Sequence, residues 1–86
     1  MSKAVTPCID VCKYKLKGHC IGCGMTEAQK RRSERLDRKE MAAFVAALER
    51  QQAALERPFW AWETAYRRKC ERAGAPCPLD DARAES

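Results

Sequence analysis

The chain has 86 residues, of which six are cysteine, and it carries a formal net charge of +5 at pH 7. A single domain of this size buries too little apolar surface for a deep core, and such domains often need a disulfide or a metal as a staple. Aromatic residues make up only 7% of the chain, and no apolar run is long enough to cross a membrane. The composition therefore excludes a membrane-spanning segment and favours a thin packing of helices.

The stretch 8–24, CIDVCKYKLKGHCIGCG, which we call the metal knot, holds four of the six cysteines and the only histidine. The four are Cys8, Cys12, Cys20 and Cys23, with the spacing C-x3-C-x7-C-x2-C. Two thiolates separated by two residues reach one metal ion when the backbone turns tightly, and Gly22 and Gly24 allow the positive φ angles of such a turn. A single helical turn would place Cys8 and Cys12 on one face. We therefore predict one site with four thiolates, as in a structural zinc site or a four-cysteine iron–sulfur cluster.

Two other interpretations of these cysteines involve no metal: they form two disulfides, or they are unrelated buried thiols. The N-terminal sequence MSKAVTPCIDVCKYK shows neither the apolar segment nor the cleavage pattern of a secretory signal. We therefore expect a cytoplasmic protein, and a reducing compartment favours metal over disulfides. His19, directly before Cys20, is an alternative ligand because imidazole binds zinc and iron, although four thiolates already complete a tetrahedral site.

The positive charge is concentrated in the first half of the chain. Residues 1–40 carry ten Lys or Arg against five Asp or Glu, whereas residues 41–86 carry seven of each. A dication held by four thiolates leaves a local charge of about −2, which neighbouring basic side chains would neutralise. These side chains are Lys13, Lys15, Lys17, Lys30, Arg31 and Arg32. Nucleic acid is a weaker alternative partner, because no aromatic residue lies within the run KRR for base stacking.

Two capping-box patterns predict two helices after the metal knot. Thr26 with Gln29 predicts a short, polar helix. Asp37 with Glu40 predicts a longer helix that ends at or kinks before Pro58. The longer helix has an amphipathic face formed by Met41, Phe44, Val45 and Leu48. We expect this face to pack against the metal knot.

A further helix is predicted to begin near Pro58 and to end at Gly74. Phe59, Trp62 and Tyr66 fall on one face of this helix, and Trp60 falls on another. We expect these aromatic residues to form a second small core. Phe59, Trp60 and Trp62 are also the candidate contact with another protein, since tryptophan is frequent at protein interfaces.

The last part of the chain contains the remaining two cysteines, Cys70 and Cys77. They allow a second metal, a disulfide or free thiols, and we expect free thiols because two ligands make a poor metal site. Residues 78–86, PLDDARAES, are expected to form a disordered tail.

The run TPCIDVCKYKLKGHCIGCGMTEAQ resembles the DUF1289 family of small bacterial proteins, which are often labelled predicted iron–sulfur proteins. Its members typically begin with (S/T)PC-(I/V)-x-(V/I)-C and continue to C-x-GC-x-RT. The matching positions here are Thr6, Pro7, Cys8, Ile9, Val11, Cys12, Cys20, Gly22, Cys23 and Thr26. The resemblance covers roughly residues 6–50. It implies a metal site rather than a reaction, because the family has no settled activity. The family helix usually carries an apolar residue and a tryptophan where this chain has Lys30 and Ser33.

The sequence thus predicts a mostly α fold, with a small N-terminal four-cysteine metal knot followed by two or three helices. The expected parts are residues 1–57 (metal knot and amphipathic helix), 58–77 (aromatic helix) and 78–86 (tail). We expect no enzyme, since no serine or cysteine nucleophile has a plausible histidine partner.

The predicted function is that of a small metal-binding accessory or electron-transfer protein that works with another protein. The resemblance favours an iron–sulfur cluster with Cys8, Cys12, Cys20 and Cys23 as ligands. The C-x2-C-G turn taken alone favours Zn²⁺, and a single iron bound by four thiolates is a third choice. The alternative function is a zinc-stapled adaptor that contacts another protein through its aromatic residues.

Overall fold

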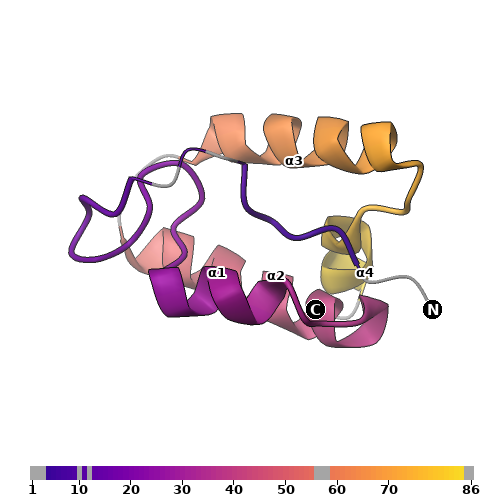
Figure 1. Cartoon of the computed structure of the whole chain (residues 1–86), viewed down its shortest axis with the longest axis horizontal. Coiled ribbons are helices and arrows are strands. Elements are labelled where there is room, and N and C mark those ends of the chain that lie inside the picture. The colour runs from indigo at the N-terminus through magenta and orange to yellow at the C-terminus, as the bar shows by residue number, and fades with distance from the viewer. Residues whose placement is uncertain (1–3, 10, 12, 56–58, 85–86) are drawn as a thin grey trace.

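The computed structural model describes residues 4–9, 11, 13–55 and 59–84. Four helices lie in this part of the chain: α1 (Glu27–Ser33), α2 (Arg38–Ala54), α3 (Trp60–Ala73) and α4 (Pro78–Ala84). Figure 1 shows α3 on one side and α1 with α2 on the other, with the N-terminal segment running between them. The described residues contain isolated β-bridges within residues 16–26 but no strand. The predicted mostly α fold is confirmed.

Both predicted capping boxes are present. The Thr26 hydroxyl accepts a hydrogen bond from the Gln29 amide at 3.2 Å, and the Gln29 side chain accepts one from the Thr26 amide at 2.8 Å. Asp37 and Glu40 make the same reciprocal pair at the start of α2, at 2.8 and 3.2 Å. Each box satisfies two backbone amides that a helix start leaves without partners. The start of each helix is therefore determined by residues that are three positions apart in the sequence.

The α2 helix forms the base of the core. Three residues of the predicted apolar face, Met41, Val45 and Leu48, are buried, while Phe44 is half-buried. Leu36, just before the helix, is buried in the same cluster as Met41, as expected for a hydrophobic residue that closes the helix start. The N-terminal segment lies against this end of the core, because the Ala4 amide donates to the Leu36 carbonyl.

The first helix, α1, contacts the N-terminal segment through Ser33. This side chain is fully buried, and its hydroxyl lies 2.7 Å from the hydroxyl of Thr6 and donates to the Lys30 carbonyl at 2.7 Å. In the DUF1289 family, which the sequence resembles, the position of Ser33 usually carries a tryptophan. Here a small polar residue fills it, and Thr6 completes its hydrogen bonding.

The third helix, α3, ends as predicted at Gly74, which adopts the left-handed conformation with φ of 66°. Glycine takes this conformation without a steric penalty, and the Ala75 amide then donates to the Cys70 carbonyl at 3.1 Å. The chain reverses here and runs into α4.

The prediction of a disordered tail over residues 78–86 was wrong for residues 78–84, which form α4. Leu79 and Ala82 are buried on one face of α4, and this helix packs against α2. Burial of apolar side chains against a neighbouring helix offsets the entropy cost of ordering a short segment. That partner face lies far away in the sequence, so a local reading of PLDDARAES missed it.

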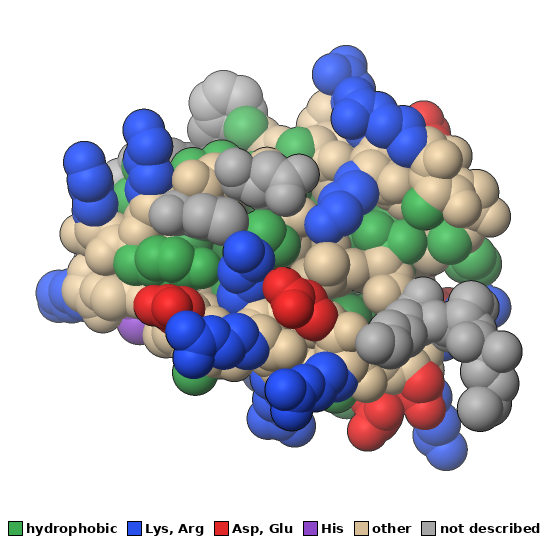
Figure 2. Space-filling model, in the orientation of Figure 1, with side chains coloured by type: hydrophobic (Ala, Val, Ile, Leu, Met, Phe, Trp, Pro, Cys, Tyr) green, Lys and Arg blue, Asp and Glu red, His purple; other side chains and the backbone are tan. Residues whose placement is uncertain are grey.

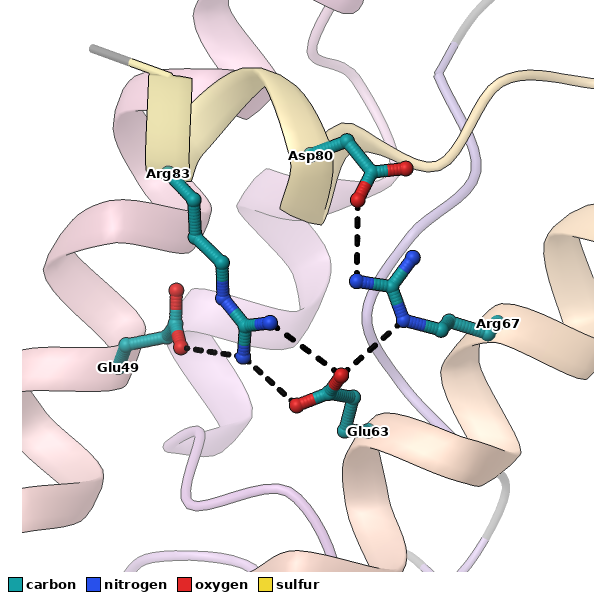
Figure 3. A network of polar contacts seen from close by, with 5 residues as sticks. All are labelled: Glu49, Glu63, Arg67, Asp80 and Arg83. Carbon is teal, nitrogen blue, oxygen red and sulfur yellow. Dashed lines mark hydrogen bonds and ion pairs between the residues drawn. The ribbon is translucent and has the colours of Figure 1, made fainter. Parts of the chain in front are cut away.

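A network of five charged residues connects the helices α2, α3 and α4 (Figure 3). Arg83 of α4 contacts Glu49 of α2 at 3.3 Å and Glu63 of α3 at 2.6 Å. Arg67 bonds to the same Glu63 at 3.1 Å and to Asp80 at 3.0 Å. The two neighbouring guanidinium groups, through hydrogen bonds from Arg83 and then Arg67, lower the pKa of the Glu63 carboxyl. The network links α4 to α2 and α3, and its partial exposure limits how much it stabilises the fold.

Candidate metal centre

The described cysteines of the metal knot lie together in the core. Cys8, Cys20 and Cys23 are 2–3% exposed and belong to one buried cluster. Cys20 and Cys23 also share a side-chain hydrogen bond. Cys12 lies outside the described residues. In the ranges that the structure describes, no group of three Cys, His, Asp or Glu side chains is arranged to hold a metal ion.

A tight turn carries Cys20 and Cys23. The Cys20 amide donates to the Met25 carbonyl at 2.7 Å, and the Gly24 amide donates to the Cys20 carbonyl at 2.9 Å. Gly24 has a φ of 80°, as the sequence predicted. The turn therefore presents both sulfurs on its inner side without any help from a regular helix or strand.

Gly22 is required for a different reason from the predicted one. It does not have a positive φ, so the expectation of such an angle at this position was wrong. Its amide instead donates to the Cys20 sulfur at 3.4 Å. A Cβ atom at Gly22 would lie 2.7 Å from Cγ2 of Val11, inside van der Waals contact. The close approach of Val11 to the turn thus requires glycine here.

The two cysteines of the turn have different electrostatic environments. Burial raises the pKa of the Cys20 thiol, but hydrogen bonds from the backbone amides of Gly22, Cys23 and Lys13 outweigh burial and hold this pKa below its usual value. Burial raises the pKa of the Cys23 thiol to about 12, and the nearby Cys20 and Cys8 add to the rise. Backbone donors therefore favour the thiolate form of Cys20, whereas burial favours the protonated form of Cys23.

The loop between the two cysteine pairs folds back onto the turn. The Ile21 amide donates to the Lys13 carbonyl at 2.9 Å, and the Lys13 amide points to the Cys20 sulfur. A hairpin turn closes the loop through mutual backbone bonds between Leu16 and His19 at 2.9 and 3.1 Å. His19 Nδ1 lies 3.1 Å from the Leu16 carbonyl. The histidine side chain thus belongs to this hairpin.

The end of α2 binds the turn through two glutamine side chains. The buried Gln52 amide group donates to the Cys23 carbonyl at 2.8 Å, and the Gln51 amide group donates to the Gly24 carbonyl at 2.6 Å. These bonds satisfy carbonyls that would otherwise lose their water on burial. The helix that forms the core therefore also fixes the backbone of the second cysteine pair.

The first cysteine is held by α3. Trp62 Nε1 donates to the Pro7 carbonyl at 2.9 Å, and the Tyr66 hydroxyl donates to the Val5 carbonyl at 2.7 Å. Lys69 Nζ donates to the carbonyls of Thr6 at 3.1 Å and Cys8 at 2.6 Å. We call these three α3 side chains, Trp62, Tyr66 and Lys69, the α3 clamp. Residues 5–8 thereby gain four hydrogen bonds that an isolated extended strand would lack.

The sequence did not reveal the α3 clamp, because Trp62 and Tyr66 were expected to form a separate small core. Their rings do pack against each other, with centroids 5.5 Å apart. They also belong to the same buried cluster as the cysteines. The spacing of Trp62, Tyr66 and Lys69 places three donor groups on one helical face, which was the available signal.

The three residues predicted to contact another protein do not share one environment in the structure. Trp62 is 2% exposed and is engaged within the chain, and Phe59 is half-buried with Cζ 3.5 Å from the position of a Cβ at Gly24. The side chain of Trp60 lies outside the described residues. A contact with another protein through these residues stays a prediction.

The residue types of the metal knot, and not a formed cage of ligands among its described residues, are what fit a thiolate-bound metal. Three buried sulfurs lie near one another, and backbone amides aim at the Cys20 sulfur, which is how protein sites orient thiolate ligands. Soft sulfur donors favour zinc and iron–sulfur clusters over hard cations. In the described part of the chain, no helix combines the length and the apolar character needed to cross a membrane.

Comparison with known proteins adds a family match to this geometry. The family model described as "Protein of unknown function (DUF1289)" matches residues 6–52. The match contains the metal knot, α1 and nearly all of α2, and it leaves out α3 and α4. Searches of the curated proteins and of the solved structures found no match.

Proposed function

The chain belongs to the DUF1289 family, and we propose that it is a small metal-binding protein with an accessory or electron-transfer role. The proposed ligands are Cys8, Cys12, Cys20 and Cys23. Buried cysteines gathered around the Cys20 sulfur, which accepts a hydrogen bond from the Gly22 amide, carry this proposal. A cell interior that keeps thiols reduced is the compartment in which such a site functions.

Cys12 is the proposed fourth ligand because of the residue that follows it. The Lys13 amide points to the Cys20 sulfur, and the Lys13 carbonyl accepts from Ile21. The chain next to Cys12 is therefore bound to the turn that carries Cys20 and Cys23. Four thiolates complete the coordination of zinc or of an iron–sulfur cluster.

We favour an iron–sulfur cluster, on the family resemblance of the cysteine pattern. When bound, such a cluster supplies one-electron transfer, and hydrogen bonds to its sulfur ligands help to set its potential. The residues of this chain supply those bonds through the amides of Gly22 and Lys13. Lys69 places a positive charge beside the Cys8 carbonyl, where it would partly balance the negative charge of the thiolates.

Zinc is the second candidate, and the closure of the knot supports it. Gln52 covers the turn from α2, and the α3 clamp covers Cys8 from the other side. A site enclosed by four protein ligands is typical of structural zinc. In that case the protein is an adaptor, and the metal stabilises the surface that another protein contacts.

A nucleic-acid partner has less support. Figure 2 shows Lys and Arg side chains spread over the visible face with Asp and Glu among them, and not gathered in one stripe. Binding to nucleic acid would predict an affinity that falls steeply with salt. An interaction seen only at very low salt would reject this alternative.

Anaerobic purification followed by elemental analysis and a visible spectrum tests the proposal. A coloured protein with iron and acid-labile sulfide supports the cluster, and a colourless protein with one zinc supports the adaptor. Cys20→Ser and Cys23→Ser should each abolish metal binding, whereas Cys77→Ser, outside the metal knot, should leave the metal content unchanged. Absence of both metals from the wild-type protein after reconstitution would refute the proposal.

A further inference from the structure

The two cysteines outside the metal knot lie at the connection between α3 and α4. Cys70 lies in the last turn of α3, and Cys77 directly precedes α4. Gly74 reverses the chain between them, and the Ala75 amide donates to the Cys70 carbonyl at 3.1 Å. The Asp80 amide donates to the Cys77 carbonyl at 3.1 Å. Both cysteine backbones are therefore fixed by hydrogen bonds within this reversal.

The reversal brings the two thiols into contact. Cys77 packs against the buried cluster that contains Cys70 and Tyr66, and the two thiols interact with each other. Both residues are reduced thiols in this structure. The chain reversal at Gly74 and the packing of Cys77 on the cluster that contains Cys70 place the two cysteines where a disulfide can join them.

The two thiols differ in access to solvent. Cys70 is 2% exposed, whereas Cys77 is half-buried and opens to the surface. Burial raises the pKa of the Cys70 thiol to about 12, and the hydrogen bond with Cys77 adds to the rise. An accessible thiol beside a protected one is the arrangement in which the first attacks an external disulfide and the second resolves the product.

We propose that Cys70 and Cys77 form a reversible disulfide by exchange with a low-molecular-weight disulfide such as oxidised glutathione. The Cys77 sulfur attacks one sulfur of the small disulfide, forms a mixed disulfide and releases one small thiol. Cys70 then loses its proton to solvent, and its sulfur attacks that of Cys77 and releases the second small thiol. Two protein thiols are oxidised, and one small disulfide is reduced to two thiols.

This site is independent of the metal centre. Neither cysteine lies in residues 6–52, which carry the family match and the proposed ligands. The cross-link would join the end of α3, which holds Cys8 through the neighbouring Lys69, to the start of α4. It therefore fixes the joint between the helix that closes the metal knot and the helix that packs on α2.

Peptide mapping of the full-length, metal-loaded protein tests the proposal. The protein is equilibrated in glutathione buffers of stepped redox potential, free thiols are blocked, and trypsin is added. Cleavage after Lys69, Arg72 and Arg83 places Cys70 in peptide 70–72 and Cys77 in peptide 73–83. A disulfide therefore appears as these two peptides joined together, with a loss of two hydrogens. We expect the joined peptides to rise from less than a tenth of the protein to most of it across the titration.

The single variants separate the two steps of the exchange. Cys70→Ala should accumulate glutathione on Cys77, and Cys77→Ser should leave Cys70 as a thiol and produce no joined peptides. Because Cys70 is buried and its variant risks unfolding, the wild-type titration carries the test if Cys70→Ala does not fold, with Cys77→Ser as the control that cannot form the joined peptides. Two free thiols throughout the wild-type titration would overturn the proposal. So would glutathione retained on Cys77, or joining of either cysteine to residues 8–23.

Discussion

Replacing Lys69 by methionine tests whether α3 holds the first cysteine in place. The substitution keeps most of the aliphatic stem but removes the ammonium group that donates to the carbonyls of Thr6 and Cys8 at 3.1 and 2.6 Å. Hydrogen bonds from a charged donor contribute about 1.5–3 kcal/mol each when buried. Because Lys69 is only partly buried, we discount this value and expect a combined loss of about 2 kcal/mol.

The loss should appear in two measurements. The unfolding midpoint of the metal-free protein should fall by roughly 8–16 °C, since about 1 kcal/mol corresponds to 4–8 °C in a domain of this size. Binding of metal must then also order residues 5–8, so the affinity measured against a competing chelator should fall by up to about 30-fold.

Arg68→Met is the matched control, because it removes the same charge from an exposed position next to Lys69. It should change the unfolding midpoint by no more than roughly 2–4 °C, corresponding to about 0.5 kcal/mol. Equal effects of the two substitutions on stability and on metal affinity would refute the α3 clamp as the support of Cys8.

Three further predictions follow from the packing and the titrating groups. Gly22→Ala should destabilise the protein by about 1–3 kcal/mol in urea unfolding, because its Cβ would meet Val11 at 2.7 Å; a neutral result would show that Val11 moves aside freely. Leu79→Ala should cost about 2–5 kcal/mol, because Leu79 is fully buried, whereas a truly disordered tail would tolerate it without loss. Stability of the metal-free protein should also fall as pH rises above about 9, as measured by urea unfolding at pH 8 and 10.5. Burial raises the pKa of Cys70 to about 12 and also raises that of Tyr66, so the folded state keeps protons that the unfolded chain releases. A Tyr66→Phe, Cys70→Ala double variant should show a flatter dependence on pH, and an equally steep one would contradict this assignment.

The sequence predicted the features that depend on neighbouring residues. Thr26 and Asp37 cap their helices through atoms three residues away, and Gly74 ends α3 through its own backbone freedom. These interactions use one short stretch of chain each, so their residue types and spacing identify them. The gathering of Cys20 and Cys23 in one turn belongs to the same class.

The features that the sequence missed depend on residues far apart in the chain. The bond from Trp62 to Pro7 spans 55 residues, and helical periodicity shows which side chains share a face but not what that face meets. The same holds for α4, whose helix is stabilised by burial of Leu79 against α2 and by Arg83 in the network of Figure 3. The sequence identified Gly22 as important. The reason that glycine is needed there is the approach of Val11, a residue outside the turn that contains Gly22.

Cys8 and the Cys20–Cys23 turn are bound by different helices, and this has a consequence for biosynthesis. During translation, Gln52 leaves the ribosome soon after the Cys20–Cys23 turn that it binds, so this half of the motif can fold early. Trp62 and Lys69 emerge later, and only then can the N-terminal segment that carries Cys8 be fixed. A nascent chain therefore presents the two sulfurs of the turn first, and Cys8 is fixed beside them only after α3 has been synthesised.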